Sequence, residues 1–538
     1  MSEGSSKNSP HVDFDVVIVG AGWGGMYMLH QCRKLGLSAR VIEAGPSVGG
    51  TWYWNRYPGL RCDVESVQYS YSFDKELQQE WNWTERYASQ ADILKYANHV
   101  ADRFDLRRDI TFNTRVSSVR YGQDGVWQIA AEGGKKLAAR YVVMATGCLS
   151  KPKDVQLPGM SEFAGEVYHT ANWPEKPVDF SGKRVGIIGT GSSGIQAIPI
   201  LAREAKHLSI FQRTPSYSIP AHNRTLEATY VDGIKKNYDQ LREEARHHMV
   251  GIPAPTHAMS VFDVDQATRE AAYAHCYDNG LPFALMVTFA DLLVSEEANR
   301  TLQDYLARRI RERVKDPEVA EQLIPRDQFA GTRRLCIDTN YYETFNRPNV
   351  GLKNIAKNPI ETVTKTGIQL KDGHEDLDCI VFATGYDAMS GALLAIDIQG
   401  IDGIKLKDQW EAGPRTMMGL MIAGFPNMFT ITGPGSPSVL SNMVVSIEQH
   451  VEWIAQCLRS MQEKGKNKIE ATAEAQNEWV AHVNAVANST LFPRGNTWYM
   501  GANVPGKPRV FMPYLGVGDY RSRCDEVTKA DYKGFVIA

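Results

Sequence analysis

The chain has 538 residues, a length that predicts about three to four domain-sized units at roughly 150 residues each. It carries 59 Lys and Arg against 62 Asp and Glu, for a formal net charge of −3. This balance excludes a generic nucleic-acid binder, which would be basic. Hydrophobic residues make up 43% and charged residues 22%, which excludes a disordered or fibrous chain.

The eight cysteines are scattered and include no C-x-x-C pair. A disulfide framework or a zinc site is therefore not expected, and the pattern suits a reducing compartment. The N-terminal residues are polar, without an apolar signal core, and residues 1–12 are interpreted as a disordered tail. No run of 18 apolar residues occurs, so we expect no membrane span and a cytoplasmic location.

A βαβ unit opens the chain after the tail. A β-branched strand at 15–19 leads into the glycines of GAGWGG, a helix is expected at 26–35, and a second strand at 38–42 ends at Glu43. Gly20 permits the tight turn, Gly22 lets a pyrophosphate approach the backbone, and Gly25 permits close helix packing. Glu43 can accept hydrogen bonds from an adenosine ribose, so this unit predicts a dinucleotide site.

The same unit recurs with different chemistry. A strand at 183–188 precedes GTGSSG, followed by a helix at 195–205 and a strand at 207–211. The position that corresponds to Glu43 is Gln212, and Arg213 follows it. An arginine pairs with a ribose 2′-phosphate that a carboxylate would repel, so this site should prefer NADPH over NADH. Together the two units predict a flavoprotein with FAD on the first and NADPH on the second.

The predicted fold class is α/β, with two Rossmann-like dinucleotide-binding domains and a helical insertion. Two strands, at 140–147 and 377–385, end in Ala-Thr-Gly and are interpreted as closing strands of the two domains. Residues 226–326 are rich in Glu, Lys, Arg, Ala and Gln with helical spacing, as at 230–248 and 296–315. The predicted order is 13–150 (FAD domain, first part), 151–220 (NADP domain, first part), 221–330 (helical subdomain), 331–385 (NADP domain, second part) and 386–538 (FAD domain, second part, with a C-terminal closing segment).

Two further motifs identify a family. Residues 163–174 fit the pattern F-x-G-x-x-x-H-x-x-x-W-P, although Glu175 follows where Asp or Tyr is usual. Residues 50–63 form a second aromatic-rich fingerprint. In both, the chain resembles the type I Baeyer–Villiger monooxygenases, nearest to the phenylacetone and cyclohexanone monooxygenase group. The resemblance extends from Asp15 to the C-terminus, and segments 433–443 and 498–512 are similar to the phenylacetone branch.

The resemblance assigns roles to individual residues. Arg334 matches the active-site arginine of the family, and Asp63 matches the carboxylate beside it. Arg333 matches a position, usually lysine, that contacts the 2′-phosphate. Trp498 matches a tryptophan on a segment that closes over NADP, and His169 lies on a linker where it is either structural or couples domain motion to cofactor binding.

The full candidate set follows. The catalytic candidates are Arg334 and Asp63. The FAD-binding candidates are Gly20, Gly22, Gly25, Glu43, Thr51, Trp52, Asp63, Tyr69, Val116 and Met443. The NADP-binding candidates are Gly189, Thr190, Gly191, Ser192, Ser193, Gly194, Gln196, Arg213, Thr214, Arg333 and Trp498. No metal ligand is expected.

The resemblance implies an NADPH- and O2-dependent monooxygenase that inserts one oxygen atom beside a ketone carbonyl, giving an ester or lactone. In the family, oxygen adds to the flavin C4a and the peroxide attacks the ketone, and Arg334 would stabilise the resulting negative charge. The partners are then a small ketone and O2, with no nucleic acid or membrane. The oligomeric state is open, and a monomer is compatible with the sequence.

Three alternatives share parts of this pattern. A flavin monooxygenase that oxidises nitrogen or sulfur has both nucleotide motifs but does not require Arg334. A pyridine-nucleotide disulfide reductase would need a redox cysteine pair, which the chain lacks. A catalytically silent nucleotide sensor would not need Asp63 and Arg334. The loop at 433–443 resembles the longer loop of the phenylacetone branch, and this resemblance implies open-chain or aryl ketones over compact rings.

Overall fold

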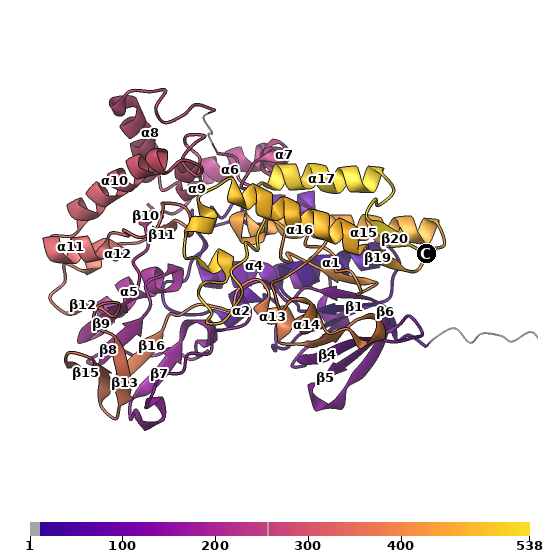
Figure 1. Cartoon of the computed structure of the whole chain (residues 1–538), viewed down its shortest axis with the longest axis horizontal. Helices are drawn as coiled ribbons and strands as arrows, with labels where there is room; N and C mark the ends of the chain where they lie inside the picture. The colour runs from indigo at the N-terminus through magenta and orange to yellow at the C-terminus, as the bar shows by residue number, and fades with distance from the viewer. Residues whose placement is uncertain (1–10, 255–257) are drawn as a thin grey trace, which may run out of the picture.

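The computed structural model describes residues 11–254 and 258–538, so most of the predicted tail lies outside the described residues. Two sheets lie side by side, and most of the helices form a layer over them (Figure 1). Both sheets are built around a parallel strand that leads into one of the glycine turns. This arrangement confirms the predicted α/β fold class.

The first sheet has the strand order β17-β4-β5-β6-β1-β2-β3, and β18 also pairs with β6. β1 lies between β2 and β6 and is parallel to both, and Val16, Val17 and Ile18 are fully buried, as in a strand covered on both faces. The strands are β1 (Phe14–Val19), β2 (Ala39–Ile42), β3 (Ile110–Thr111), β4 (Val116–Tyr121), β5 (Trp127–Ala131), β6 (Lys136–Met144), β17 (Asp397–Gln399) and β18 (Met428–Thr430). Because β17 and β18 come from the C-terminal third, distant parts of the chain build this sheet.

The second sheet is parallel throughout, with the order β12-β9-β8-β16-β7. Its strands are β7 (Glu166–His169), β8 (Arg184–Ile188), β9 (His207–Gln212), β12 (Val350–Asn354) and β16 (Cys379–Phe382). The strands predicted to end in Ala-Thr-Gly are β6 and β16. Each pairs with the strand before a glycine turn, β6 with β1 and β16 with β8. A small antiparallel sheet, β13 (Ile360–Thr364), β14 (Gly367–Leu370) and β15 (His374–Asp376), follows β12.

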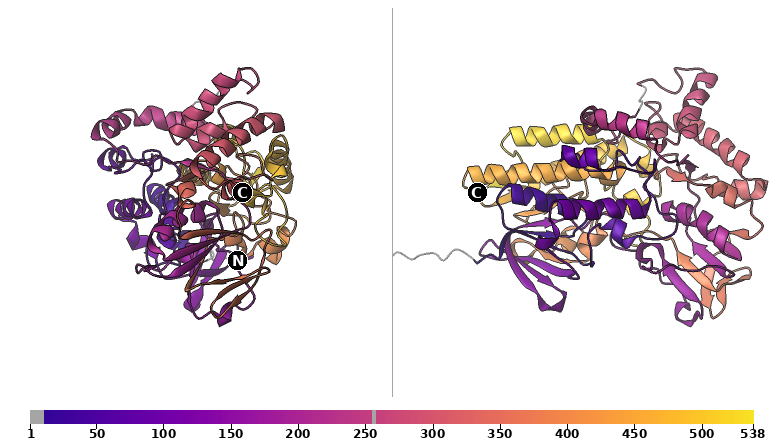
Figure 2. Two further views of the ribbon diagram at one scale, coloured as in Figure 1. Left: turned by 90° about the vertical axis from the view of Figure 1, so that its left-hand side faces the viewer. Right: turned by 180° about the vertical axis from the view of Figure 1, so that it is seen from behind.

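Helices from both ends of the chain cover the first sheet (Figure 2). α1 and α15 pack together, and a Cβ at Gly24 would lie 3.0 Å from the Ile431 side chain, so α1 sits close to the strands. The helices of this part are α1 (Trp23–Lys34), α2 (Thr51–Trp54), α3 (Lys75–Glu80), α4 (Gln90–Arg103), α13 (Gly391–Leu394), α14 (Leu406–Gln409), α15 (Met443–Glu463), α16 (Ala473–Asn488) and α17 (Val517–Lys529). The last strands, β19 (Ile469–Ala471) and β20 (Phe535–Ile537), pair with each other.

The predicted helical insertion is present, but the helix expected at 230–248 is two helices. Asn237 ends the first because its backbone N–H bonds to Ile234 and its side chain donates to the carbonyl of Gly233 at 2.9 Å. The insertion contains α6 (Ala228–Lys236), α7 (Tyr238–His247), α8 (Gln266–Asp278), α9 (Pro282–Met286), α10 (Glu296–Arg313) and α11 (Pro317–Leu323). The helix expected at 296–315 is α10 and ends two residues earlier.

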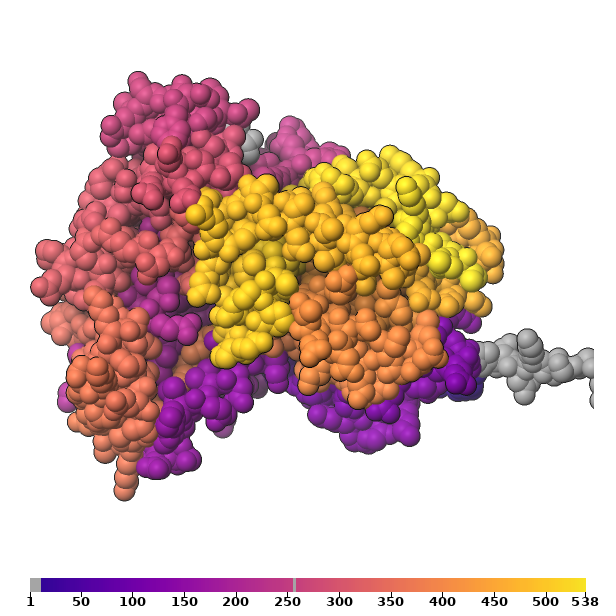
Figure 3. All heavy atoms as spheres, in the orientation of Figure 1, coloured from indigo at the N-terminus to yellow at the C-terminus, as the bar shows by residue number. Residues whose placement is uncertain are grey.

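A long irregular segment after α16 crosses the middle of one face of the molecule (Figure 3). It is attached to the chain just after β16, where Asn503 donates to the carbonyl of Tyr386 at 2.8 Å and Lys507 bonds to Asp387 at 2.5 Å. The segment therefore holds the C-terminal part of the chain against the connection between the two sheets. In the described part of the chain, no helix is long and apolar enough to cross a bilayer.

Candidate active site

The first glycine turn joins β1 to α1. Gly20 has a φ of +106°, and a Cβ there would lie 2.6 Å from the carbonyl oxygen of Ala145. A Cβ at Gly25 would lie 1.8 Å from the carbonyl oxygen of Gly20, so the helix and the turn are in close contact. α1 starts after Gly22 and receives no side-chain cap from the described residues. Its first backbone N–H groups are therefore available for a pyrophosphate.

Glu43 closes the same turn. The buried carboxylate accepts hydrogen bonds from the backbone N–H groups of Ala21 at 2.6 Å and Gly45 at 2.7 Å. Burial raises the pKa of Glu43, and these two backbone hydrogen bonds act in the opposite direction. Each carboxylate oxygen keeps a further lone pair, which fits the predicted contact with ribose hydroxyls.

Other predicted FAD residues lie on α2, β4 and α15, and Tyr69 lies in the chain between α2 and α3. α2 carries Thr51 and Trp52, and the Trp52 indole donates to the Tyr69 hydroxyl at 3.1 Å. Met443 is the first residue of α15 and is half-buried. The side chain of Val116 packs in the core of the first sheet, so a cofactor contact there would use the backbone.

The second glycine turn repeats the first in detail. A Cβ at Gly189 would lie 2.4 Å from the carbonyl oxygen of Ala383, and one at Gly194 would lie 2.2 Å from that of Gly189. A Cβ at Gly191 would meet no described atom within 4 Å, so the space before α5 (Ser192–Glu204) is open. This open space and the uncapped helix start fit a second pyrophosphate.

The polar residues around this turn connect it to its neighbours. The Thr190 hydroxyl donates to the carbonyl of Thr214 at 3.1 Å, which joins the ends of β8 and β9. The Ser192 hydroxyl lies 3.1 Å from the Cys336 sulfur, and Ser193 follows it at the start of α5. The beginning of α5 is therefore in contact with the strand that follows Arg334.

Two predicted cations lie close together beyond β9. Arg213 is exposed, and among the described residues its guanidinium has no hydrogen-bond or ion-pair partner. Within the described ranges, Arg333 donates only to the carbonyl of Asn496, at 2.6 Å. Burial and the nearby Arg213 lower the pKa of Arg333. Two nearby guanidinium groups with no carboxylate partner in the described part of the chain form a site suited to a phosphate.

Arg334 and Asp63 form a bidentate ion pair, although they are 271 positions apart. Arg334 Nε donates to Asp63 Oδ2 at 2.5 Å and Nη2 donates to Oδ1 at 2.9 Å. Nη1 donates to the carbonyl of Val439 at 2.6 Å, and the guanidinium lies 4.7 Å from the Phe283 ring centre. Burial by itself lowers the pKa of Arg334, but the surrounding groups, the Asp63 carboxylate first among them, together raise it by more, so the arginine stays charged.

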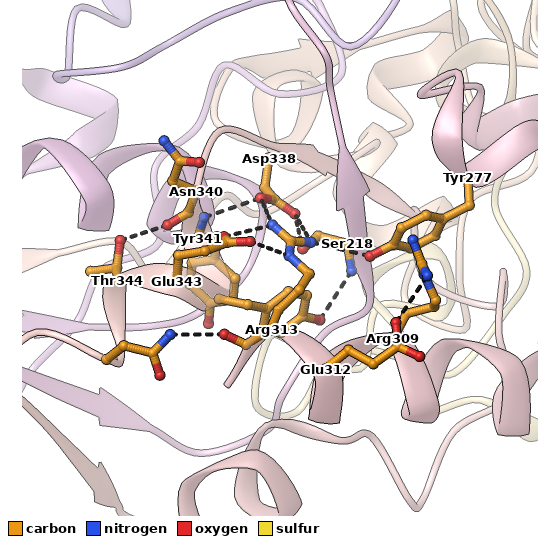
Figure 4. Close-up of polar contacts among 12 residues, drawn as sticks. Ser218, Tyr277, Arg309, Glu312, Arg313, Asp338, Asn340, Tyr341, Glu343 and Thr344 are labelled. Atoms are coloured by element: carbon orange, nitrogen blue, oxygen red, sulfur yellow. Dashed lines mark hydrogen bonds and ion pairs between the residues drawn. The ribbon is translucent and has the colours of Figure 1, made fainter. Parts of the chain in front are cut away.

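A second buried ion pair holds the strand that carries Arg334. β11 (Cys336–Asp338), which pairs with β10 (Ser218–Pro220), starts two residues after Arg334 and ends at Asp338. Asp338 accepts from Arg313 of α10 at 2.7 Å and from the Ser218 hydroxyl at 2.7 Å (Figure 4). Arg313 also donates to Glu343 in α12 (Tyr341–Thr344) at 2.6 Å and 2.8 Å. The helical insertion thereby fixes β11, the strand that follows Arg334 in the chain.

The loop that carries Asp63 packs directly against α5. Tyr57 donates its hydroxyl to Gln196 at 2.9 Å, and the Gln196 amide donates to the carbonyl of Arg61 at 3.0 Å. Gly59 has a φ of +82°, and a Cβ there would lie 2.3 Å from the carbonyl oxygen of Gln196. The predicted NADP residue Gln196 therefore serves as a contact between the two nucleotide-binding parts.

Gly59→Ala selectively tests the contact between the Asp63 loop and α5. We expect the added Cβ to displace the Asp63 loop from α5 and to destabilise the protein by about 1–3 kcal/mol. Thermal unfolding and the fraction of NADPH consumed without product formation would measure the effect. Gly36→Ala is the matched control, because Gly36 has a φ of +70° but a Cβ there would meet no described atom within 4 Å. If the two variants had the same thermal stability and consumed the same fraction of NADPH without product, the proposed role of the contact between the Asp63 loop and α5 would be contradicted.

Comparisons with known proteins agree with this geometry. Residues 17–279 match the family described as pyridine nucleotide-disulphide oxidoreductase. An acetone monooxygenase (methyl acetate-forming) from Gordonia sp. (strain TY-5) is 40% identical, over 97% of this chain and 99% of that protein. A Baeyer–Villiger monooxygenase from Pseudooceanicola batsensis is 40% identical, over 97% and 96%. A phenazine N-monooxygenase from Lysobacter antibioticus is 39% identical, over 97% of both.

Two solved structures are similar over nearly the whole chain. A steroid monooxygenase bound to NADP has 47% identity and a TM-score of 0.94, covering 97% of this chain and 99% of that one. OTEMO in complex with FAD and NADP has 39% identity and a TM-score of 0.95, covering 98% and 100%. The chain belongs to the Baeyer–Villiger monooxygenase family.

As a Baeyer–Villiger monooxygenase the chain is an FAD-dependent oxidoreductase that uses NADPH, and both glycine turns fit that cofactor pair. All eight cysteines are free and buried. His169 accepts from the backbone of Ala171 at 3.0 Å and contacts Thr384 at 3.1 Å, which ties β7 to the end of β16.

Several contacts around the site of this Baeyer–Villiger monooxygenase correspond to no sequence motif. Arg313 and Asp338 are 25 positions apart and match no motif, yet they fix the strand after Arg334. Tyr57 and Gly59 lie in the fingerprint at 50–63, which assigns them no role.

The predicted NADP residue Trp498 lies in the 3-10 turn Trp498–Met500 and is half-buried. The centre of its ring lies 4.3 Å from the centre of the Tyr499 ring.

Proposed function

We propose that this chain converts a ketone to an ester or lactone, with Arg334 as the fixed cation at the reacting centre. Ketone, O2, NADPH and a proton give the ester or lactone, NADP+ and water. When bound, FAD that NADPH has reduced supplies the activation of O2. The observation that carries the proposal is the bidentate Arg334–Asp63 pair, which joins the arginine before β11 to a carboxylate 271 positions earlier in the chain.

The surroundings of Arg334 support this role. Its side chain is 16% exposed and that of Asp63 is 27% exposed, so water is largely excluded from the pair. In such an environment a fixed cation stabilises developing negative charge more strongly than it could in water. Asp63 and the Val439 carbonyl hold the guanidinium in one orientation, so no reorganisation is needed when charge develops.

The loop at 433–443 supports a proposal about the ketone. Arg334 bonds to the backbone of Val439 in this loop, and Met443 begins α15 at its end. The loop therefore lies beside the proposed reacting centre and can select the substrate. We propose open-chain or aryl ketones over compact ring ketones, because this segment resembles the phenylacetone branch of the family.

Product analysis with isotopically heavy O2 tests the proposal. The purified enzyme would be incubated with NADPH and a panel of open-chain, aryl and compact cyclic ketones. We expect an ester carrying one heavy oxygen atom, formed fastest from the open-chain and aryl members. NADPH consumption that yields only hydrogen peroxide across the panel would contradict ketone oxidation, and faster turnover of the compact rings would contradict the substrate preference.

Oxidation of nitrogen is the second candidate, favoured by the 39% identity to a phenazine N-monooxygenase. Adding aromatic N-heterocycles, amines and sulfides to the same panel separates the two activities. An N-oxide formed without any ester would favour this candidate.

We also propose a cytoplasmic location, which the eight free, buried cysteines support.

A further inference from the structure

Lys153 occupies a defined position above the second sheet. Its backbone N–H donates to the carbonyl of Gly385 at 3.1 Å, and Pro152 forms an isolated bridge with Tyr386. Gly385 follows β16, which lies beside β8, the strand that leads into the second glycine turn. The residue is therefore held at the carboxyl end of this sheet, the edge at which dinucleotides bind.

Three cations gather at this edge without a counter-charge. Among the described residues, the amino group of Lys153 and the guanidinium of Arg213 have neither a hydrogen-bond nor an ion-pair partner. In residues 11–254 and 258–538, the side chain of Arg333 donates only to the Asn496 carbonyl. Burial and the nearby Arg213 lower the pKa of Lys153, and the same two causes lower that of Arg333. Lys153 and Arg333 are half-buried and Arg213 is exposed. Like charges repel one another, so an anion bound between these three cations would be stabilised.

We infer that Lys153 is a third cation for the 2′-phosphate of NADPH, beside Arg213 and Arg333, and contributes to the preference for NADPH over NADH. The glycine motif and the loss of the acidic residue at Gln212 predict Arg213, but they carry no information about position 153. A phosphate dianion with three cations forms several charge-assisted hydrogen bonds, whereas NADH has no group for Lys153 to contact. The inference rests on the use of NADPH and not on the oxidised substrate.

The test compares Lys153→Gln with Lys151→Gln in the FAD-loaded enzyme. Lys151 is the matched control because it is an exposed lysine two positions away and its loss changes the net charge equally. Steady-state oxidation of NADPH and NADH without a ketone gives the cofactor preference. Calorimetric titration with adenosine 2′,5′-bisphosphate and with AMP gives binding affinities that do not depend on turnover.

For Lys153→Gln we expect the NADPH-to-NADH ratio of kcat/KM and the affinity for the bisphosphate to fall about tenfold. Oxidation of NADH and binding of AMP should change less than twofold, and Lys151→Gln should resemble the wild type in every measurement. Lys153→Arg should restore most of the preference. An equal loss for NADPH and NADH would assign Lys153 to the pyrophosphate and overturn the inference, as would an unchanged ratio. Because no ketone is present, failure of the proposed ketone oxidation would not affect this result.

Discussion

Replacing Arg334 with alanine is expected to lower the rate of ester formation by about 10²- to 10³-fold, the loss typical of removing a charge-stabilising donor. The variant should retain FAD, because Arg334 contacts Asp63, Val439 and Phe283 and none of the residues of the first glycine turn. The flavin absorbance per protein after gel filtration and the rate of ester formation measure the two effects separately.

Arg334→Lys distinguishes charge from geometry. Lysine keeps a cation but cannot donate two parallel hydrogen bonds to Asp63 while a third reaches Val439. Because the guanidinium must be held in one orientation, we expect Arg334→Lys to recover only a small part of the ester-forming rate that Arg334→Ala loses. Ester formation by Arg334→Ala within tenfold of the wild type would exclude the proposed role, and the heavy-oxygen product analysis would then show whether another atom type is oxidised.

The organisation of the two sheets could be predicted because it depends on local patterns. A βαβ unit is defined by short β-branched strands and by glycines at a fixed spacing. The residue at the end of its second strand, Glu43 or Gln212, indicates the nucleotide. β1 and β8 both begin such a unit. The break at Asn237 could not be predicted from helical spacing, which continues across it. It depends on a side-chain hydrogen bond to Gly233, one turn earlier.

The remainder of the site depends on tertiary contacts that sequence patterns do not encode. The family resemblance predicts that Arg334 and Asp63 lie together, but it does not identify the residues that position them. Arg313 reaches Asp338 only because α10 packs beside β11, and Tyr57 reaches Gln196 across 139 positions. The clustering of Lys153 with Arg213 likewise requires the strand order of the second sheet, in which β8 separates β9 from β16.

Removing the Asp63 carboxylate is the complementary test of the ion pair. In Asp63→Ala, Arg334 keeps the Val439 carbonyl and the Phe283 ring but loses both bonds to Asp63. We expect a loss of about 1–3 kcal/mol in the free energy of unfolding, because a largely buried cation is left without its partner. Burial would then lower the pKa of Arg334 with no opposing carboxylate, and the side chain would be free to turn away from the reacting centre.

The expected functional effect is a fall of about 10- to 100-fold in ester formation, with NADPH consumption continuing and hydrogen peroxide released instead. The rate of ester formation by Asp63→Asn should lie between the rates of the wild type and of Asp63→Ala, since an amide oxygen can accept one of the two hydrogen bonds. Asp109→Ala provides the matched control, because it breaks the Arg33–Asp109 ion pair, whose side chains are 22% and 27% exposed and which lies outside the Asp63 loop. If Asp63→Ala kept the ratio of ester to NADPH of the wild type, the carboxylate would serve stability alone and Arg334 would be positioned by Val439 and Phe283.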